Sequence, residues 1–152
     1  MMHNILIVDD SASIREAFTA ILSPLARCRT AVNGREAVDV VKECRSRGER
    51  FDLILMDIIM PEKDGLAAVK EIREFETAMG WTGKDATTII IVTTISNPSR
   101  ILLAQYECGA DAYITKPFTE KTVLQTLSNN GLYLAGASCD AGQDPNQWDG
   151  FI

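Results

Sequence analysis

Within residues 51–61, FDLILMDIIMP, an apolar run that begins at Leu53 leads to a carboxylate, Asp57. Apolar side chains without polar alternation are typical of a strand buried on both faces, as in the centre of a parallel sheet. Pro61 has no amide hydrogen for a strand ladder, so the strand should end before it. Asp57 is then expected at the carboxyl end of a central strand, where open α/β sheets bind ligands. From this stretch alone, the alternative is that Asp57 only begins a turn.

Four other segments are predicted to be strands, and amphipathic patterns predict a helix after each of the five. The additional strands are expected at residues 5–8 (ILIV), 28–32, 87–94 (TTIIIVTT) and 112–114. Strand and helix therefore alternate along the whole chain, which predicts an α/β fold with a parallel sheet and right-handed crossovers.

Helix boundaries are predicted from capping residues. Ser13 and Glu16 fit a capping box at the start of the first helix. Asp64-Gly65 is expected to open the third helix, and Asn97-Pro98 the fourth. Gly109 is predicted to end the fourth helix as a C-cap.

The composition and charge exclude several classes of function. The chain has 152 residues with 46% hydrophobic and 24% charged residues, as expected for one soluble domain. Its net charge of -6 argues against nucleic acid binding by the chain itself. No signal peptide or membrane-length apolar segment is evident, so a cytoplasmic protein without membrane contact is expected. The four cysteines are widely spaced, which excludes the usual zinc patterns and gives no sign of a disulfide framework: Cys28, Cys44, Cys108 and Cys139.

The composition changes after the last predicted helix. We expect one domain over residues 1–128, followed by a tail over residues 129–152 that extends the last helix or is flexible. Leu132, Tyr133 and Leu134 are candidates to hold the tail at one end, and Trp148 or Phe151 at the other.

Polar side chains follow several of the predicted strands. Because parallel strands end at one edge of a sheet, these side chains should converge there: Asp9, Asp10, Asp57, Thr93, Thr94 and Lys116. Three carboxylates would repel one another without a cation, and oxygen ligands alone favour Mg²⁺. With a lysine and a threonine hydroxyl beside them, this set indicates a phosphoryl-transfer site with Asp57 as nucleophile.

The pattern resembles the receiver domain of two-component response regulators over about residues 3–128. The matching positions are Asp9-Asp10, Asp57, Met60-Pro61, Asp64-Gly65, Thr93, residues 109–113 (GADAY) and Lys116-Pro117-Phe118. The resemblance implies the flavodoxin-like fold: a doubly wound, five-stranded parallel sheet with strand order 2-1-3-4-5 and five helices.

By this resemblance, Asp57 accepts a phosphoryl group from a histidine kinase or phosphotransfer protein. Asp10 and Asp57 would ligate Mg²⁺ directly, together with the backbone carbonyl of Ile59, and Asp9 would act through water. The chain would be a phosphoacceptor that assists its own phosphorylation and dephosphorylation, and not an enzyme in the ordinary sense.

The resemblance also implies how a signal leaves the site. Lys116 would bind a phosphoryl oxygen and precede a cis proline, Thr93 would move toward another oxygen, and Tyr113 would turn inward. The face formed by the fourth helix, the fifth strand and the last helix would then bind a downstream protein or a second copy of the chain. It includes Arg100, Tyr106 and Lys121.

Three features depart from the family pattern. Thr94 is bulkier than the usual small residue after the switch threonine, and the loop at residues 79–86 is longer. Ile59 stands where an aspartate-nucleophile phosphatase needs a second acid, so a phosphatase is the least favoured reading of the site. A receiver that acts by itself is favoured first, and the N-terminal receiver of a larger regulator second.

Overall fold

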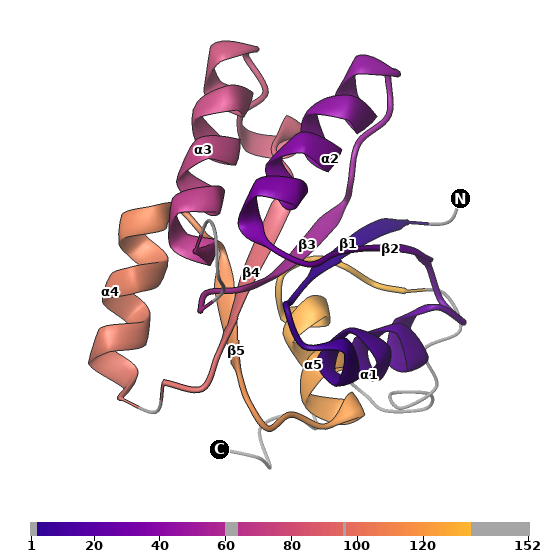
Figure 1. The fold of residues 1–152 in the computed structure, drawn as a ribbon, viewed down its shortest axis with the longest axis vertical. Helices are drawn as coiled ribbons and strands as arrows, with labels where there is room; N and C mark the ends of the chain where they lie inside the picture. The colour runs from indigo at the N-terminus through magenta and orange to yellow at the C-terminus, as the bar shows by residue number, and fades with distance from the viewer. Residues whose placement is uncertain (1–2, 60–63, 96, 135–152) are drawn as a thin grey trace.

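A five-stranded parallel sheet runs through the centre of the molecule (Figure 1). The structure is a computed structural model that describes residues 3–59, 64–95 and 97–134. Neighbouring strands follow the order β2-β1-β3-β4-β5, as the resemblance implied. Their bounds are β1 (Asn4–Val8), β2 (Arg27–Ala31), β3 (Leu53–Asp57), β4 (Thr88–Thr93) and β5 (Ala112–Thr115).

Helices cover both faces of this sheet. The bounds are α1 (Ala12–Leu22), α2 (Gly34–Ser46), α3 (Gly65–Ala78), α4 (Pro98–Cys108) and α5 (Glu120–Asn129), with a short 3-10 turn at Gly83–Asp85. One apolar core joins the sheet to α2, α3 and α4, and a second joins it to α1 and α5. The predicted doubly wound α/β fold is confirmed.

The strands differ in how deeply they are buried. Every residue of β3 is buried, whereas only Ala31 is buried in the edge strand β2. Each large aliphatic side chain taken out of water contributes about 1.5–3 kcal/mol. Most of the sheet's apolar stabilisation therefore lies in its central strands, and Asp57 is at the end of one of them.

The predicted caps of the third and fourth helices are confirmed. The Asp64 carboxylate accepts a hydrogen bond from the amide of Ala67, and the Asn97 side chain accepts from the amides of Ser99 and Arg100. Gly109 ends α4 with a left-handed φ of 84°, a conformation that glycine adopts without steric cost.

The predicted capping box at Ser13 is wrong. The N-cap of α1 is Ser11, whose hydroxyl accepts a hydrogen bond from the amide of Ile14. The Asp9 carboxylate accepts the amide hydrogen of Ser11, so the chain turns into the helix two residues earlier than predicted.

The chain after α5 continues along the α1 and α5 side of the sheet. Leu132 and Leu134 are buried in the core cluster on this side, as predicted. The prediction for Tyr133 is wrong, because its side chain is exposed to solvent. Trp148 and Phe151, the other predicted anchors, lie outside the described residues. Within the described ranges, none of the helices combines the length and apolar character needed to cross a membrane.

Candidate functional site

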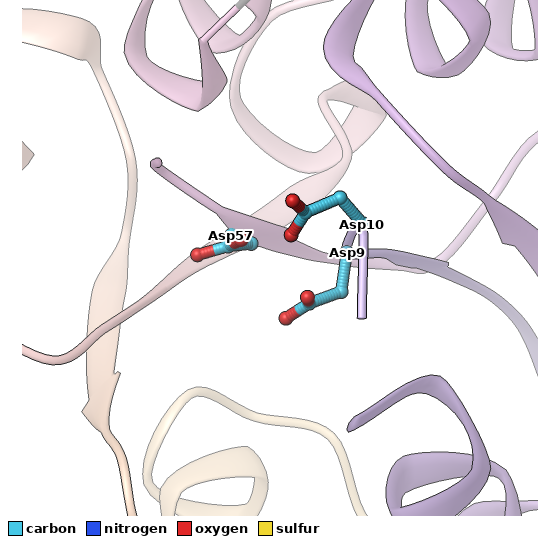
Figure 2. Close-up of side chains that lie close together, drawn as sticks. All are labelled: Asp9, Asp10 and Asp57. Carbon is cyan, nitrogen blue, oxygen red and sulfur yellow. The ribbon is translucent and has the colours of Figure 1, made fainter. Parts of the chain in front are cut away.

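Three carboxylates meet at the carboxyl ends of β1 and β3 (Figure 2). Asp9 and Asp10 follow β1, and Asp57 is the last residue of β3, the strand that pairs with β1. One oxygen from each carboxylate lies within 4.8 Å of the others. Asp9 and Asp57 are only 1% and 5% exposed, whereas Asp10 is open to solvent. The structure thus brings together the three carboxylates that the sequence placed at this edge.

Lys116, directly after β5, reaches the same place. Its ammonium nitrogen lies 2.9 Å from Oδ2 of Asp9 and 3.4 Å from Oδ1 of Asp57. Burial alone would lower the pKa of Lys116, but the hydrogen bond to Asp9 and the charges of Asp57 and Asp9 raise it overall. Lys116 is consequently a fixed cation, and its peptide bond to Pro117 is cis as the resemblance implied.

The charge of this site is only partly balanced. Burial raises the pKa of Asp57 to about 6, and the nearby Asp9 charge adds to the effect, while Lys116 opposes it. One lysine thus faces two buried carboxylates and the exposed Asp10. A cluster of carboxylate oxygens with excess negative charge fits a hard divalent cation such as Mg²⁺.

Asp9 is held in position by groups that the sequence did not single out. Its carboxylate accepts a hydrogen bond from the Ser11 amide at 2.9 Å, and its backbone carbonyl accepts one from the Arg15 guanidinium at 2.7 Å. Arg15 lies in the first turns of α1. Without knowledge of how α1 packs against β1, nothing in the sequence distinguishes it from a solvated arginine.

Gly65 brings the start of α3 against the backbone of Asp57. A Cβ atom placed on Gly65 would overlap the Asp57 carbonyl oxygen, and its amide donates to the carbonyl of Ile58 at 3.1 Å. The sequence marked Asp64-Gly65 as a helix start, but the contact with the phosphoacceptor candidate went unpredicted. Only glycine permits this close approach.

Thr93 lies on β4, the neighbour of β3, and Tyr113 lies on β5, one strand further from the carboxylates. Thr93 is buried at the end of β4, and its hydroxyl accepts a hydrogen bond from the Ile95 amide at 3.0 Å. Tyr113 in β5 is half-buried and packs against the α2–α4 side of the core. Thr94 is exposed. The Thr93 hydroxyl is thus engaged by the backbone of the β4–α4 loop.

Ile59 lies two residues beyond Asp57. Its amide is 3.5 Å from Oδ1 of Asp57, and its side chain is 64% exposed. Ligation of Mg²⁺ by the Ile59 carbonyl stays a prediction. The apolar side chain offers no acid or base beside Asp57, so an aspartate phosphatase would lack its second acid at this position.

Asp111, within the GADAY stretch, has a structural role far from the carboxylates. It accepts hydrogen bonds from the Ile89 amide at 2.8 Å and from Arg73 at 2.9 Å. Arg73 also donates to Glu76 and to the backbone carbonyl of Thr87. This network ties α3 to the start of β4 and to the α4–β5 turn, and sequence reasoning did not identify it.

Comparisons with known proteins agree with this geometry. The sequence model of the response regulator receiver domain matches residues 5–128. Chemotaxis protein CheY of Halobacterium salinarum is 36% identical over 130 residues, which cover 85% of this chain and 97% of that protein. CheY of Bacillus subtilis is 35% identical over 130 residues, 84% of this chain and 97% of that protein.

Solved structures show the same fold. The chemotaxis response regulator CheY4 of Vibrio cholerae superimposes with a TM-score of 0.70 at 32% identity, covering 85% of this chain and 98% of that chain. The BeF3-activated receiver domain of DrrB gives a TM-score of 0.65 at 26% identity, with 85% and 97% covered.

Proposed function

Because the chain belongs to the receiver domain family of two-component response regulators, we propose that Asp57 accepts a phosphoryl group from a phosphohistidine. The donor would be a histidine kinase or a phosphotransfer protein. One observation carries this proposal. Asp57 is a buried carboxylate at a strand end, with the Lys116 ammonium 3.4 Å away and the Asp9 and Asp10 carboxylates beside it.

The transfer needs an ionised Asp57. One of its carboxylate oxygens attacks phosphorus, the P–N bond breaks, and the bonding electron pair stays on the departing imidazole of the partner. The product is an acyl phosphate on Asp57. Lys116 stabilises negative charge on the phosphoryl oxygens because it is held as an ammonium group at this rim.

Asp9, Asp10 and Asp57 would hold Mg²⁺, with the Ile59 carbonyl as a further ligand. When bound, the ion supplies positive charge that offsets the charge of the transferring group. The Ser11 amide and the Lys116 ammonium hold the Asp9 carboxylate in place beside the expected ligands Asp10 and Asp57.

The phosphoryl group would act on the β4–α4 loop. The Thr93 hydroxyl, which accepts a hydrogen bond from the Ile95 amide, could donate its own hydrogen to a phosphoryl oxygen. Thr93 would then draw the loop inward, and Tyr113 would follow. The face that changes contains α4, β5 and α5, including Arg100, Tyr106 and Lys121. Tyr106 on this face is 85% exposed, which supports a role in binding a partner or a second copy.

We assign no catalytic turnover to the chain beyond help with its own phosphorylation and dephosphorylation. Ile59 cannot activate water for attack on the acyl phosphate, so the signal should decay slowly. Output through protein binding suits a receiver that acts by itself, as well as one joined to further domains.

Treatment of the full chain with acetyl phosphate tests the assignment. Intact-mass measurement should show one added phosphoryl group when Mg²⁺ is present and none when it is chelated. Asp57→Asn should abolish the addition, whereas Thr93→Ala should preserve it and weaken its effect on hydrogen exchange in α4. A phosphoryl group that persists in Asp57→Asn would place the nucleophile elsewhere.

A further inference from the structure

A hollow of about 240 Å³ lies between α3 and α4, apart from the carboxylate cluster. The two helices are neighbours on the same side of the sheet (Figure 1). Leu66 of α3 and Leu103 and Ala104 of α4 supply the apolar part of its lining. Leu103 is 59% exposed, so a large apolar side chain faces water here.

The lining follows helical spacing on both walls. Arg100, Leu103, Ala104 and Glu107 are at positions i, i+3, i+4 and i+7 of α4, which places them on one face. Leu66 and Lys70 are one turn apart on α3. The hollow is therefore a continuous surface along two rigid helices.

Positive charge borders the apolar part. Lys70 and Arg100 both line the hollow, and neither has an ion-pair partner among the residues that the structure describes. Glu107 is the acidic residue in the described part of the lining. On a chain with a net charge of -6, these two cations beside an exposed leucine favour an acidic partner.

The volume of the hollow limits what kind of ligand or partner group can fill it. Pockets for small-molecule ligands usually measure roughly 300–1,000 Å³, so this one is small for a cofactor. It suits a single large side chain. A two-fold contact would set this surface, with two cations and one acidic residue in its lining, against an identical surface. The excess of like charge disfavours self-association through it.

We propose that the α3–α4 hollow docks an acidic segment of a partner protein that inserts one large apolar side chain. Carboxylates beside that side chain would pair with Lys70 and Arg100. The surface lies on the α3 side of α4 and shares Arg100 with the proposed output face, the rest of which lies toward β5 and α5.

Both walls of the hollow are connected to the proposed phosphorylation site. α3 begins at Gly65, which is packed on the Asp57 backbone, and α4 follows the loop that Thr93 holds through Ile95. Docking itself does not require phosphorylation. Its regulation by Asp57 rests on the proposed function.

Nuclear magnetic resonance titration of the full chain tests docking. The probe is a short peptide with Phe-Leu at its centre and only Asp and Glu on either side. Its matched partner has the same centre and only Lys on either side. The acidic probe should shift amide signals of residues 66–70 and 100–108. The Lys70→Glu, Arg100→Glu double variant should bind it about ten-fold more weakly or worse.

Arg35→Glu is the control, because Arg35 is a cation on α2 away from the hollow. It should change the affinity less than two-fold. Equal binding of the basic probe, shifts confined to other residues, or unaltered affinity in the double variant would each overturn the proposal. Concentration-dependent shifts of the same residues without peptide would assign the hollow to self-association and overturn it too.

The titration is repeated with Asp57→Asn. Suppose that the acidic peptide still binds Asp57→Asn and that acetyl phosphate fails to modify the parent chain. This result would support docking at the hollow and refute Asp57 as the phosphoacceptor. Phosphorylation of Asp57 without peptide binding to any form of the chain refutes the hollow alone.

Discussion

The Lys116 ammonium lies nearer to Asp9 than to any other carboxylate that the structure describes around it, with 2.9 Å between Nζ and Oδ2. Its distance to Oδ1 of Asp57 is 3.4 Å. Lys116 therefore neutralises Asp9 first, and Asp57 keeps a raised pKa because it is buried and its negative charge is incompletely balanced. This arrangement leaves room for further positive charge next to Asp57.

Lys116→Met should destabilise the fold in metal-free buffer at neutral pH. It leaves two buried carboxylates without their cation, and breaking a buried ion pair typically costs about 3–5 kcal/mol. Mg²⁺ should bind the variant more tightly because a competing positive charge is gone. Urea unfolding with EDTA or Mg²⁺ measures both effects. Lys84→Met, at an exposed position, is the control, and equal losses in the two variants would contradict this role of Lys116.

Asp57→Asn should stabilise the metal-free protein at pH 7 and change little at pH 4. The folded protein holds the Asp57 proton more tightly than the unfolded chain, since the pKa rises from 3.8 to about 6. The stabilising contribution of protonated Asp57 is complete below pH 3.8 and is lost as pH rises through 6. The difference of about two units between these pKa values limits the gain in the free energy of unfolding of Asp57→Asn to about 3 kcal/mol.

Urea unfolding in EDTA between pH 4 and pH 8 measures this gain. The difference between the parent and Asp57→Asn should grow with pH and level off above pH 7. A difference that is constant across this range would show that the charge of Asp57 is already balanced in the folded protein.

Gly65→Ala should destabilise the protein by about 2 kcal/mol or more, because the new methyl group would overlap the Asp57 carbonyl. The matched variant is Gly48→Ala, where φ is 76° and nothing lies within 4 Å of the new atom. That variant should lose about 1 kcal/mol from backbone conformation alone. Thermal unfolding compares them, and equal losses would refute close packing at Gly65.

Glu76→Gln should cost about 3 kcal/mol without changing phosphorylation of Asp57, because removing its charge leaves two partly buried guanidinium groups incompletely paired. Glu76 is 2% exposed, accepts the Thr87 amide at 2.8 Å, and pairs with Arg73 and Arg45. Glu74→Gln, on the exposed side of the same helix, should change stability by less than about 0.5 kcal/mol. Impaired phosphorylation in Glu76→Gln at temperatures where it remains folded would link this network to the site.

The strands β1, β3 and β4 were predictable because they are buried and therefore appear in the sequence as apolar runs. β3 and β4 were identified to within a residue or so, and their order in the sheet followed from the resemblance. The convergence of Asp9, Asp10 and Asp57 followed from the geometry of parallel strands. Chain topology alone sufficed for this part of the site.

Contacts that depend on packing were not predictable. Arg15 reaches the Asp9 carbonyl only because of how α1 crosses β1, and Gly65 meets Asp57 only because of where α3 begins. The helix start at Ser13 was wrong for a different, local reason. The Asp9 carboxylate accepts the amide hydrogen of Ser11, two residues further along, and Ser11 is the cap.

Chemical mapping of the phosphoryl group tests the central claim most directly. After treatment with acetyl phosphate and Mg²⁺, borohydride reduces an aspartyl phosphate to homoserine, and peptide mass spectrometry then finds the converted position. The account predicts conversion at Asp57 alone and no conversion when Mg²⁺ is chelated. Conversion at Asp9 or Asp10, or a phosphoryl group that resists borohydride, would contradict it.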